Sequence, residues 1–193
     1  MNTAKCHGCG TCAADCPSNA ITQRHFTDAQ IIAQIHAALE EKPEEKVIGF
    51  LCNWCSYGAA DLAGTSRFEY PPDIRVIRVM CSGRIDRDFV LEAFRKGAGM
   101  VMVSGCRFGD CHYISGNYNA EKRIKPLFAM LPRFGISPER LRLEWFSAAE
   151  APFYVNLNKE MSETLKKLGV ERIRAENEKA KPFLERMLQQ SGG

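Results

Sequence analysis

The run KVIGFLC, at residues 46–52, decides the fold. It is a short, continuous apolar stretch, which is typical of a strand buried on both faces of a sheet. The next residues, SYGAADLAG at 56–64, predict a helix that ends near its last glycine. Strands buried on both faces occur almost only in parallel sheets covered by helices, so this pair indicates an α/β domain.

The alternation of strand and helix continues toward the C-terminus. Strands are predicted for DIRVIRVMC (73–81), GMVMVSGC (99–106) and LRLEWFSA (141–148). Helices are predicted over 87–97, over 120–135 with Pro126 near its start or kinking it, and over 152–189 with a break near Gly169. The order predicts an open, mainly parallel sheet with flanking helices and right-handed crossovers.

The residues before this domain have a different character. Residues 1–26 are rich in Cys, Gly and small polar residues and hold too few large apolar ones to build a core. Thr27 or Asp28 can cap a helix, which the apolar spacing after them predicts. Pro43 ends this helix in what looks like a solvated linker. We therefore predict a cysteine-rich arm at 1–26, a helix and linker at 27–45, and an α/β domain with a C-terminal helical region at 46–193.

The composition excludes several classes of function. A net charge of +3, with both signs mixed along 193 residues, is too weak a field to predict nucleic-acid binding. No apolar run reaches roughly 18 residues and no secretory leader opens the chain, so we expect no membrane span and a cytoplasmic location. Nine cysteines, an odd number, predict metal ligands rather than a disulfide framework.

The run KCHGCGTCAADCPSNAI, at residues 5–21, has the spacing C-x2-C-x2-C-x3-C-P. Bacterial ferredoxins hold [4Fe–4S] clusters with this run, normally in two copies, because the fourth cysteine of each copy ligates the cluster of the other. The arm is therefore predicted to be half of a two-cluster ferredoxin. Its predicted cluster ligands are Cys6, Cys9, Cys12 and Cys16, the last of which would reach a second cluster.

Only one such run is present, so the fourth ligand of its cluster must come from elsewhere. We expect the complementary run on another polypeptide. Two alternatives stay open from the sequence: the four cysteines close around a single cluster in a distorted loop, or the first run was lost upstream of Met1.

The other five cysteines follow predicted strands. They are Cys52, Cys55, Cys81, Cys106 and Cys111. Because the carboxyl ends of parallel strands share one edge of a sheet, where ligand sites form, we expect these thiols to converge there.

Several chemistries fit five converging thiols. A [2Fe–2S] cluster uses four cysteine ligands and would leave one of the five spare. A structural zinc site would make the chain a zinc-stabilised interaction module. Cys52 and Cys55 alone form the C-x-x-C of a thiol–disulfide redox enzyme. His112 could be a Rieske-type ligand, but such a histidine is more often a neighbouring donor or a surface residue. Trp54 and Tyr113 either shield a cluster or simply pack.

Two resemblances extend this interpretation. The segments FLCNWCSYGAADLAGTSR, YPPDIRVIRVMCSGRID and GDCHYISGNYNA resemble the delta chain of methyl-viologen-reducing hydrogenase, the MvhD family, over about residues 46–170. The segment CHGCGTCAADCPSNAITQRHFTDAQIIAQI resembles the C-terminal ferredoxin tail of HdrA, the flavin-containing subunit of heterodisulfide reductase, over about residues 5–36.

The resemblance implies an electron relay with no substrate site of its own. In that family the delta domain holds a [2Fe–2S] cluster on cysteines that match the five named above. It passes electrons from a hydrogenase or a formate dehydrogenase toward HdrA, whose flavin bifurcates them. The expected partners are therefore an HdrA-like flavin subunit, together with hydrogenase or formate dehydrogenase subunits, within a larger hetero-oligomeric complex of an anaerobic cytoplasm.

Overall fold

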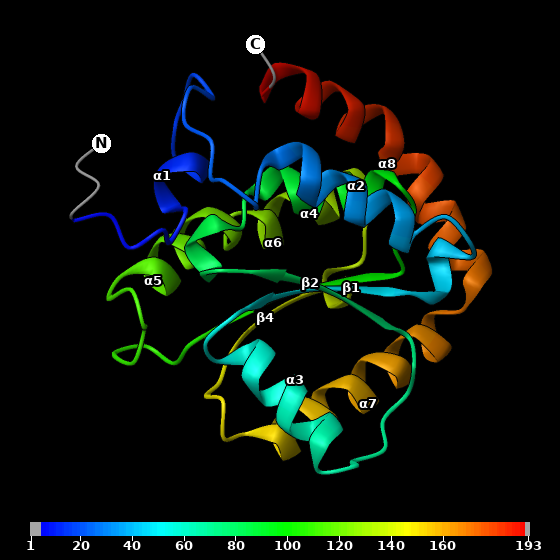
Figure 1. Cartoon of the computed structure of the whole chain (residues 1–193). Coiled ribbons are helices and arrows are strands. Elements are labelled where there is room, and N and C mark those ends of the chain that lie inside the picture. Colours follow the sequence, from blue (N-terminus) through cyan, green and yellow to red (C-terminus); the bar gives the residue numbers. More distant parts are fainter. Residues whose placement is uncertain (1–4, 192–193) are drawn as a thin grey trace.

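The protein, described over residues 5–191 by a computed structural model, is built on one four-stranded sheet (Figure 1). All neighbouring strands are parallel, in the order β2-β1-β3-β4. The predicted α/β fold is confirmed. The strands are β1 (Val47–Cys52), β2 (Ile74–Val79), β3 (Met100–Gly105) and β4 (Leu141–Trp145).

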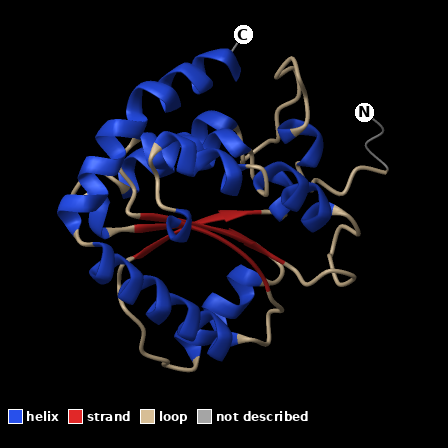
Figure 2. Ribbon diagram, turned by 180° about the vertical axis from the view of Figure 1, so that it is seen from behind, coloured by secondary structure: helices blue, strands red, loops and turns tan. Residues whose placement is uncertain are grey.

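Helices cover both faces of the sheet, as Figure 2 shows from behind. One layer contains α2 (Asp28–Ala38), α4 (Arg87–Arg95), α5 (Gly116–Ile124), α6 (Leu127–Met130) and α8 (Val170–Ser191). The other contains α3 (Ser56–Thr65) and α7 (Ala151–Leu168). Short turns complete the chain: α1 (Thr11–Ala14), η1 (Pro43–Glu45), η2 (Ser82–Arg84), η3 (Leu131–Phe134) and η4 (Pro138–Arg140).

Strand β1 explains why two helix layers form. Its side chains alternate between the two cores, with Ile48 and Phe50 in one and Val47 and Leu51 in the other. All four are almost completely buried. A strand with two apolar faces leaves the aqueous solvent only when helices pack on both of them. Within residues 5–191, no helix is long and apolar enough to cross a membrane.

The region predicted as one helix over 120–135 is divided. Helix α5 ends at Ile124, and α6 and η3 follow as separate short turns. Pro126 precedes α6 and Pro132 lies inside η3. Proline has no backbone N–H to donate, so it breaks the hydrogen-bond ladder. The prediction of one helix over these residues is therefore wrong, although Pro126 does mark a helix start, that of α6.

Helix α2 begins where the sequence indicates. The Thr27 hydroxyl accepts a hydrogen bond from the backbone of Gln30 at 3.2 Å, and the Gln30 side chain accepts one from the Thr27 backbone at 3.0 Å. This capping box satisfies two N–H groups at the helix start. Ile31, Ile35 and Leu39 then pack into the core beside β1 and β2, so α2 lies directly on the α/β sheet.

The linker expected around Pro43 is exposed at residues 40–42 but is not solvated throughout. Residues Pro43–Glu45 form the turn η1, and Glu44 is only 4% exposed. Its carboxylate pairs with Arg174 of α8. A glutamate can be buried when a cation satisfies it, and this cation lies 130 residues away in the sequence.

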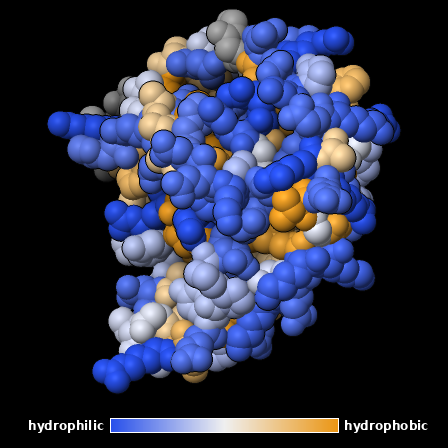
Figure 3. All heavy atoms as spheres, turned by 90° about the vertical axis from the view of Figure 1, so that its right-hand side faces the viewer, coloured by the Kyte–Doolittle hydropathy of each residue, from blue (hydrophilic) through white to orange (hydrophobic). Residues whose placement is uncertain are grey.

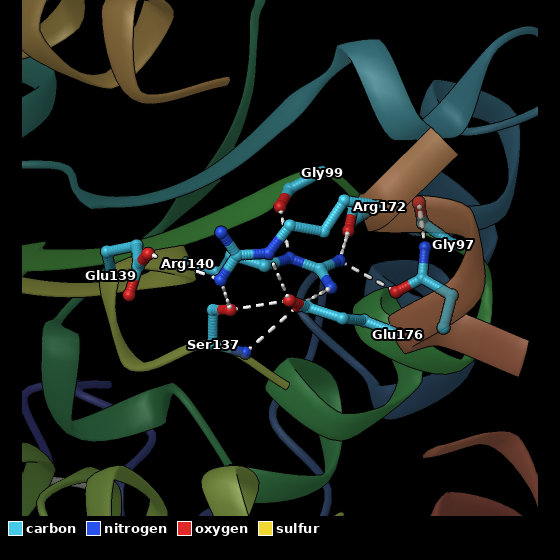
Figure 4. Close-up of polar contacts among 9 residues, drawn as sticks. Gly97, Gly99, Ser137, Glu139, Arg140, Arg172 and Glu176 are labelled. Carbon is cyan, nitrogen blue, oxygen red and sulfur yellow. Dashed lines mark hydrogen bonds and ion pairs between the residues drawn. The ribbon is translucent and has the colours of Figure 1, made fainter. Parts of the chain in front are cut away.

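A buried arginine ties α8 to the sheet (Figure 4). Arg140, the last residue of η4, is fully buried directly before β4. Its guanidinium donates to the carbonyl oxygens of Ala98 and Gly99, each at 2.7 Å. It also donates to Asn177 at 2.7 Å and to Glu176 at 2.9 Å, both on α8. Four partners around one buried cation hold the C-terminal helix against the loop that precedes β3.

Candidate metal centre

Five thiols gather at the carboxyl edge of the sheet, as the sequence predicts. We call this set the cysteine edge. Cys52 is the last residue of β1, Cys55 directly precedes α3, Cys81 follows β2 by two residues, and Cys106 and Cys111 follow β3. The structure packs them into one cluster in which all are buried except Cys55, which is partly exposed.

Within the cysteine edge the thiols form two subgroups. The Sγ atoms of Cys52, Cys55 and Cys106 all lie within 4.8 Å of one another, and those of Cys52 and Cys106 are 3.6 Å apart. Cys81 and Cys111 flank Gly116, the first residue of α5. A Cβ at this glycine would lie under 3.0 Å from the Cys81 sulfur and 3.5 Å from the Cys111 sulfur. Gly116 therefore keeps the space beside these two sulfurs free.

The packing of these thiols affects their protonation. A hydrogen bond from the Cys106 thiol lowers the pKa of Cys52 to about 2, and the same bond raises the pKa of Cys106. Burial raises the pKa of Cys81 to about 12. Crowded, buried thiols thus ionise together only when a cation compensates them. Iron and zinc both bind thiolate rather than thiol, so the donor set fits a thiolate-bound metal or iron–sulfur centre.

Aromatic rings lie over the cysteine edge. The indole N–H of Trp54 donates to the Tyr113 hydroxyl at 3.0 Å. The imidazole of His112 stacks on Trp54 with ring centroids 3.8 Å apart. His112 is thus held against an indole face. It is not part of the group Cys52, Cys55 and Cys106, which within residues 5–191 is the one group of three or more side chains placed to hold a metal ion. The sequence favours a neighbouring donor or a surface residue over a ligand at this position, and that stays a prediction.

The four arm cysteines face different surroundings. Cys9 packs against the cysteine edge. Cys6 and Cys12 line a mainly apolar hollow of about 440 Å³ with Met80. Cys16 lines a second hollow of about 440 Å³ with residues of α4 and α8. A hydrogen bond with Ser18 lowers the pKa of its thiol. The arm's thiols therefore open toward at least two separate spaces.

Sequence reasoning missed several residues of this region. Gly116 is one, because a glycine five residues after Cys111 gives no sign that it will pack against a sulfur. Arg84 and Arg123 are others. They follow no ligand pattern, yet Arg84 pairs with Asp28 at the start of α2 and Arg123 pairs with Asp15 of the arm.

Comparison with known proteins agrees with the site. Residues 1–22 match the family model of the 4Fe–4S binding domain. A ferredoxin-type arm beside a sheet edge lined with thiols defines an iron–sulfur protein. The chain belongs to the family of the methyl-viologen-reducing hydrogenase delta subunit, whose model matches residues 47–169. The MvhD resemblance is thereby confirmed.

The relatives are of two kinds. The HdrA chain of the ferredoxin:CoB-CoM heterodisulfide reductase of Methanosarcina mazei is 49% identical over 151 residues, which are 78% of this chain and 19% of that protein. The iron–sulfur delta chain of the F420-non-reducing hydrogenase of Archaeoglobus profundus is 47% identical over 131 residues, 68% of this chain and 96% of that protein. Its counterpart from Methanococcus voltae is 47% identical and covered to 91%. The chain thus spans about a fifth of the reductase protein and nearly all of the hydrogenase proteins.

Proposed function

We propose that this chain is an iron–sulfur electron-transfer subunit. It relays electrons between a hydrogenase or formate dehydrogenase and an HdrA-type, flavin-containing, electron-bifurcating heterodisulfide reductase. The observation that carries the proposal is the convergence of five thiols on one edge of the sheet, with the arm's Cys9 packed against them. The two kinds of relative support it, because one belongs to a hydrogenase and the other to a heterodisulfide reductase.

In this proposal the α/β domain and the arm each hold one iron–sulfur cluster. Four of the five thiols of the cysteine edge hold a [2Fe–2S] cluster, and Cys6, Cys9 and Cys12 hold a [4Fe–4S] cluster. Such clusters supply one-electron transfer. The chain's own residues position them, exclude water with Trp54 and Tyr113, and bind no substrate. Low-potential clusters of this kind function in the reducing, anaerobic cytoplasm.

The surface around the cysteine edge supports contact with a partner. Four large apolar side chains are exposed in or near the loops that follow β1 and β3. They are Trp54, Phe108, Ile114 and Tyr118. Exposed apolar groups with aromatic rings mark protein-binding surfaces. Figure 3, which views the opposite, amino edge of the sheet, shows mainly hydrophilic side chains with limited apolar patches.

The relay is tested with the full chain, purified anaerobically. We expect stoichiometric iron and sulfide, an EPR signal on reduction, reduction by a hydrogenase under hydrogen, and reoxidation by an HdrA-type flavin protein. A chain that holds zinc, or only a reducible Cys52–Cys55 dithiol, would contradict the proposal and favour an interaction module or a thiol redox enzyme.

A surface variant makes this test specific. Ile114 is 85% exposed and has a φ of 71°, an unfavourable conformation for a β-branched residue. Ile114→Asp should therefore keep the fold and the iron content but slow electron exchange with one partner. Leu62→Asp, on the exposed side of α3 and 38% exposed in the wild type, is the matched control and should exchange electrons at the wild-type rate.

A further prediction concerns the half-ferredoxin arm. Cys16 lines a different hollow from Cys6 and Cys12. We therefore propose that the run completing the arm cluster lies outside residues 1–193, in an HdrA-type polypeptide. In isolation the chain should hold an incomplete, three-iron arm cluster, and EPR should show the complete cluster after that polypeptide is added.

The Cys16→Ser variant separates this proposal from closure of the run around one cluster. If Cys16 reaches a second cluster, the variant should retain the arm iron of the isolated wild-type chain. If the isolated wild type holds a stable [4Fe–4S] cluster that Cys16→Ser destroys, the local alternative is correct.

A further inference from the structure

The arm and the cysteine edge meet at the residues Cys81–Arg84, which we call the junction segment. Cys81 contributes a thiol to the edge, and Ser82–Arg84 form the turn η2. The short helix α1 of the arm packs on this turn and lies at the same end of the sheet as α5 (Figure 1). Building on the proposed function, we propose that Gly83 is a positioning residue that sets the separation between the arm cluster and the edge cluster.

Gly83 occupies a position with no room for a side chain. A Cβ there would lie under 3.0 Å from the Thr11 hydroxyl oxygen of the arm. On its other side it would lie 3.0 Å from the Cα and 3.1 Å from the carbonyl oxygen of Gly116. Gly83 does not have a positive φ. Close approach of the Thr11 hydroxyl and, less closely, of the Gly116 backbone, rather than an unusual conformation, therefore requires glycine here.

Each neighbour of Gly83 leads to a cluster ligand. On the arm side, the Thr11 hydroxyl lies 3.6 Å from the Cys9 sulfur, and Cys9 packs against the cysteine edge. On the edge side, the Gly83 backbone N–H donates to the Cys81 sulfur at 3.4 Å. A side chain at Gly83 would push Thr11 outward, and Cys9 would move away from Cys81 with it.

Two arginines hold the arm in this position. Arg84, 1% exposed, donates to the Phe26 carbonyl oxygen at 3.1 Å and pairs with Asp28. Arg123 pairs with Asp15 of the arm at 2.5 Å and donates to the carbonyl oxygen of Gly83 at 3.2 Å. These pairs hold the arm against the cysteine edge on both sides of Gly83. A side chain added at Gly83 should therefore change the distance between the arm ligands and the edge ligands, because the surrounding chain is not free to adjust.

The distance between the arm ligands and the edge ligands matters because the rate of electron tunnelling falls steeply with distance. Two glycines, Gly83 and Gly116, face each other between Thr11 and the sulfurs of Cys81 and Cys111. No side chain from either position separates the two ligand sets. The arrangement suits direct electron exchange between the two centres within this chain.

The test uses Gly83→Ala in the complex that completes the arm cluster. We expect both clusters to be retained by iron and sulfide analysis, a loss of the spin–spin broadening between the two reduced clusters in EPR, and slower exchange between them. Thr11→Ala alone should leave the broadening in place. Because removal of the Thr11 hydroxyl makes room for the new methyl group, Thr11→Ala combined with Gly83→Ala should restore the broadening. Such non-additivity identifies residues in contact.

A second glycine variant serves as the control for Gly83→Ala. Gly64→Ala, in helix α3 where a Cβ would meet nothing within 4 Å, should match the wild type. If Gly83→Ala loses a cluster, recovery of that cluster in the double variant supports the positioning role and its absence overturns it. Unchanged broadening in Gly83→Ala, or no rescue by Thr11→Ala, also overturns it. A wild-type chain without clusters would instead refute the proposed function.

Discussion

Cys81→Ser should remove the cluster proposed for the cysteine edge and leave the α/β fold in place. Cys81 is the only cysteine at the end of β2, and it is only 3% exposed. A serine hydroxyl is a poor replacement for a thiolate, and no second thiol from the same strand end can take over. We expect the iron content to fall to that of the arm cluster alone and the edge signal to disappear from the EPR spectrum.

The other four edge cysteines provide the comparison. The proposed [2Fe–2S] cluster would use four cysteine ligands, so one of the five should be dispensable. Cys52, Cys55 and Cys106 lie within 4.8 Å of one another, which allows one of these sulfurs to replace another. We expect at least one single Cys→Ser variant among those four to keep its iron. An unchanged spectrum and iron content in Cys81→Ser would refute the proposed site.

Arg140→Ala should give the largest loss of stability in the chain. The fully buried guanidinium serves two carbonyl oxygens, Asn177 and the Glu176 carboxylate. Its removal leaves all four acceptors without this donor and a carboxylate without its buried cation. Breaking a buried pair of this kind costs about 3–5 kcal/mol, so the free energy of unfolding should fall by that amount. Anaerobic urea unfolding followed by circular dichroism measures it.

A neighbouring arginine serves as the control for this variant. Arg142 lies two residues further on, in β4, is partly exposed, and pairs with Glu144 at 3.1 Å and Glu160 at 3.3 Å. Solvent-exposed pairs contribute about 0–1 kcal/mol. Arg142→Ala should therefore lower the free energy of unfolding far less than Arg140→Ala. Equal losses in the two variants would show that burial of the Arg140 network does not matter.

The strands and the cysteine edge could be predicted because both follow from local pattern and one rule of topology. The apolar run before Cys52 identifies a doubly buried strand, and parallel strands bring their carboxyl ends together. The positions of the edge cysteines just after strands then imply their convergence without any knowledge of side-chain packing. A local pattern also indicated Thr27 or Asp28 as the cap of α2, and the structure places the cap at Thr27.

The contacts that hold the molecule together could not be predicted in this way. Glu44 appears in a charged run, EEKPEEK, that reads as solvated, and only the arrival of Arg174 from α8 allows its burial. Arg84 and Asp28 are separated by 56 residues. No short-range pattern records that two oppositely charged side chains will meet, because their distance depends on how whole helices dock.

The sequence by itself determined the class of fold, the edge where thiols would gather and the ferredoxin-type arm, because hydrophobic period and cysteine spacing are local properties of a chain. The tertiary structure alone decided which thiols are neighbours, that Cys9 faces the edge while Cys16 faces another hollow, and that Gly83 lies beneath Thr11. These facts depend on a close fit of surfaces distant in sequence. Atoms that pack at van der Waals distance respond to a single added methyl group, whereas a sequence pattern does not.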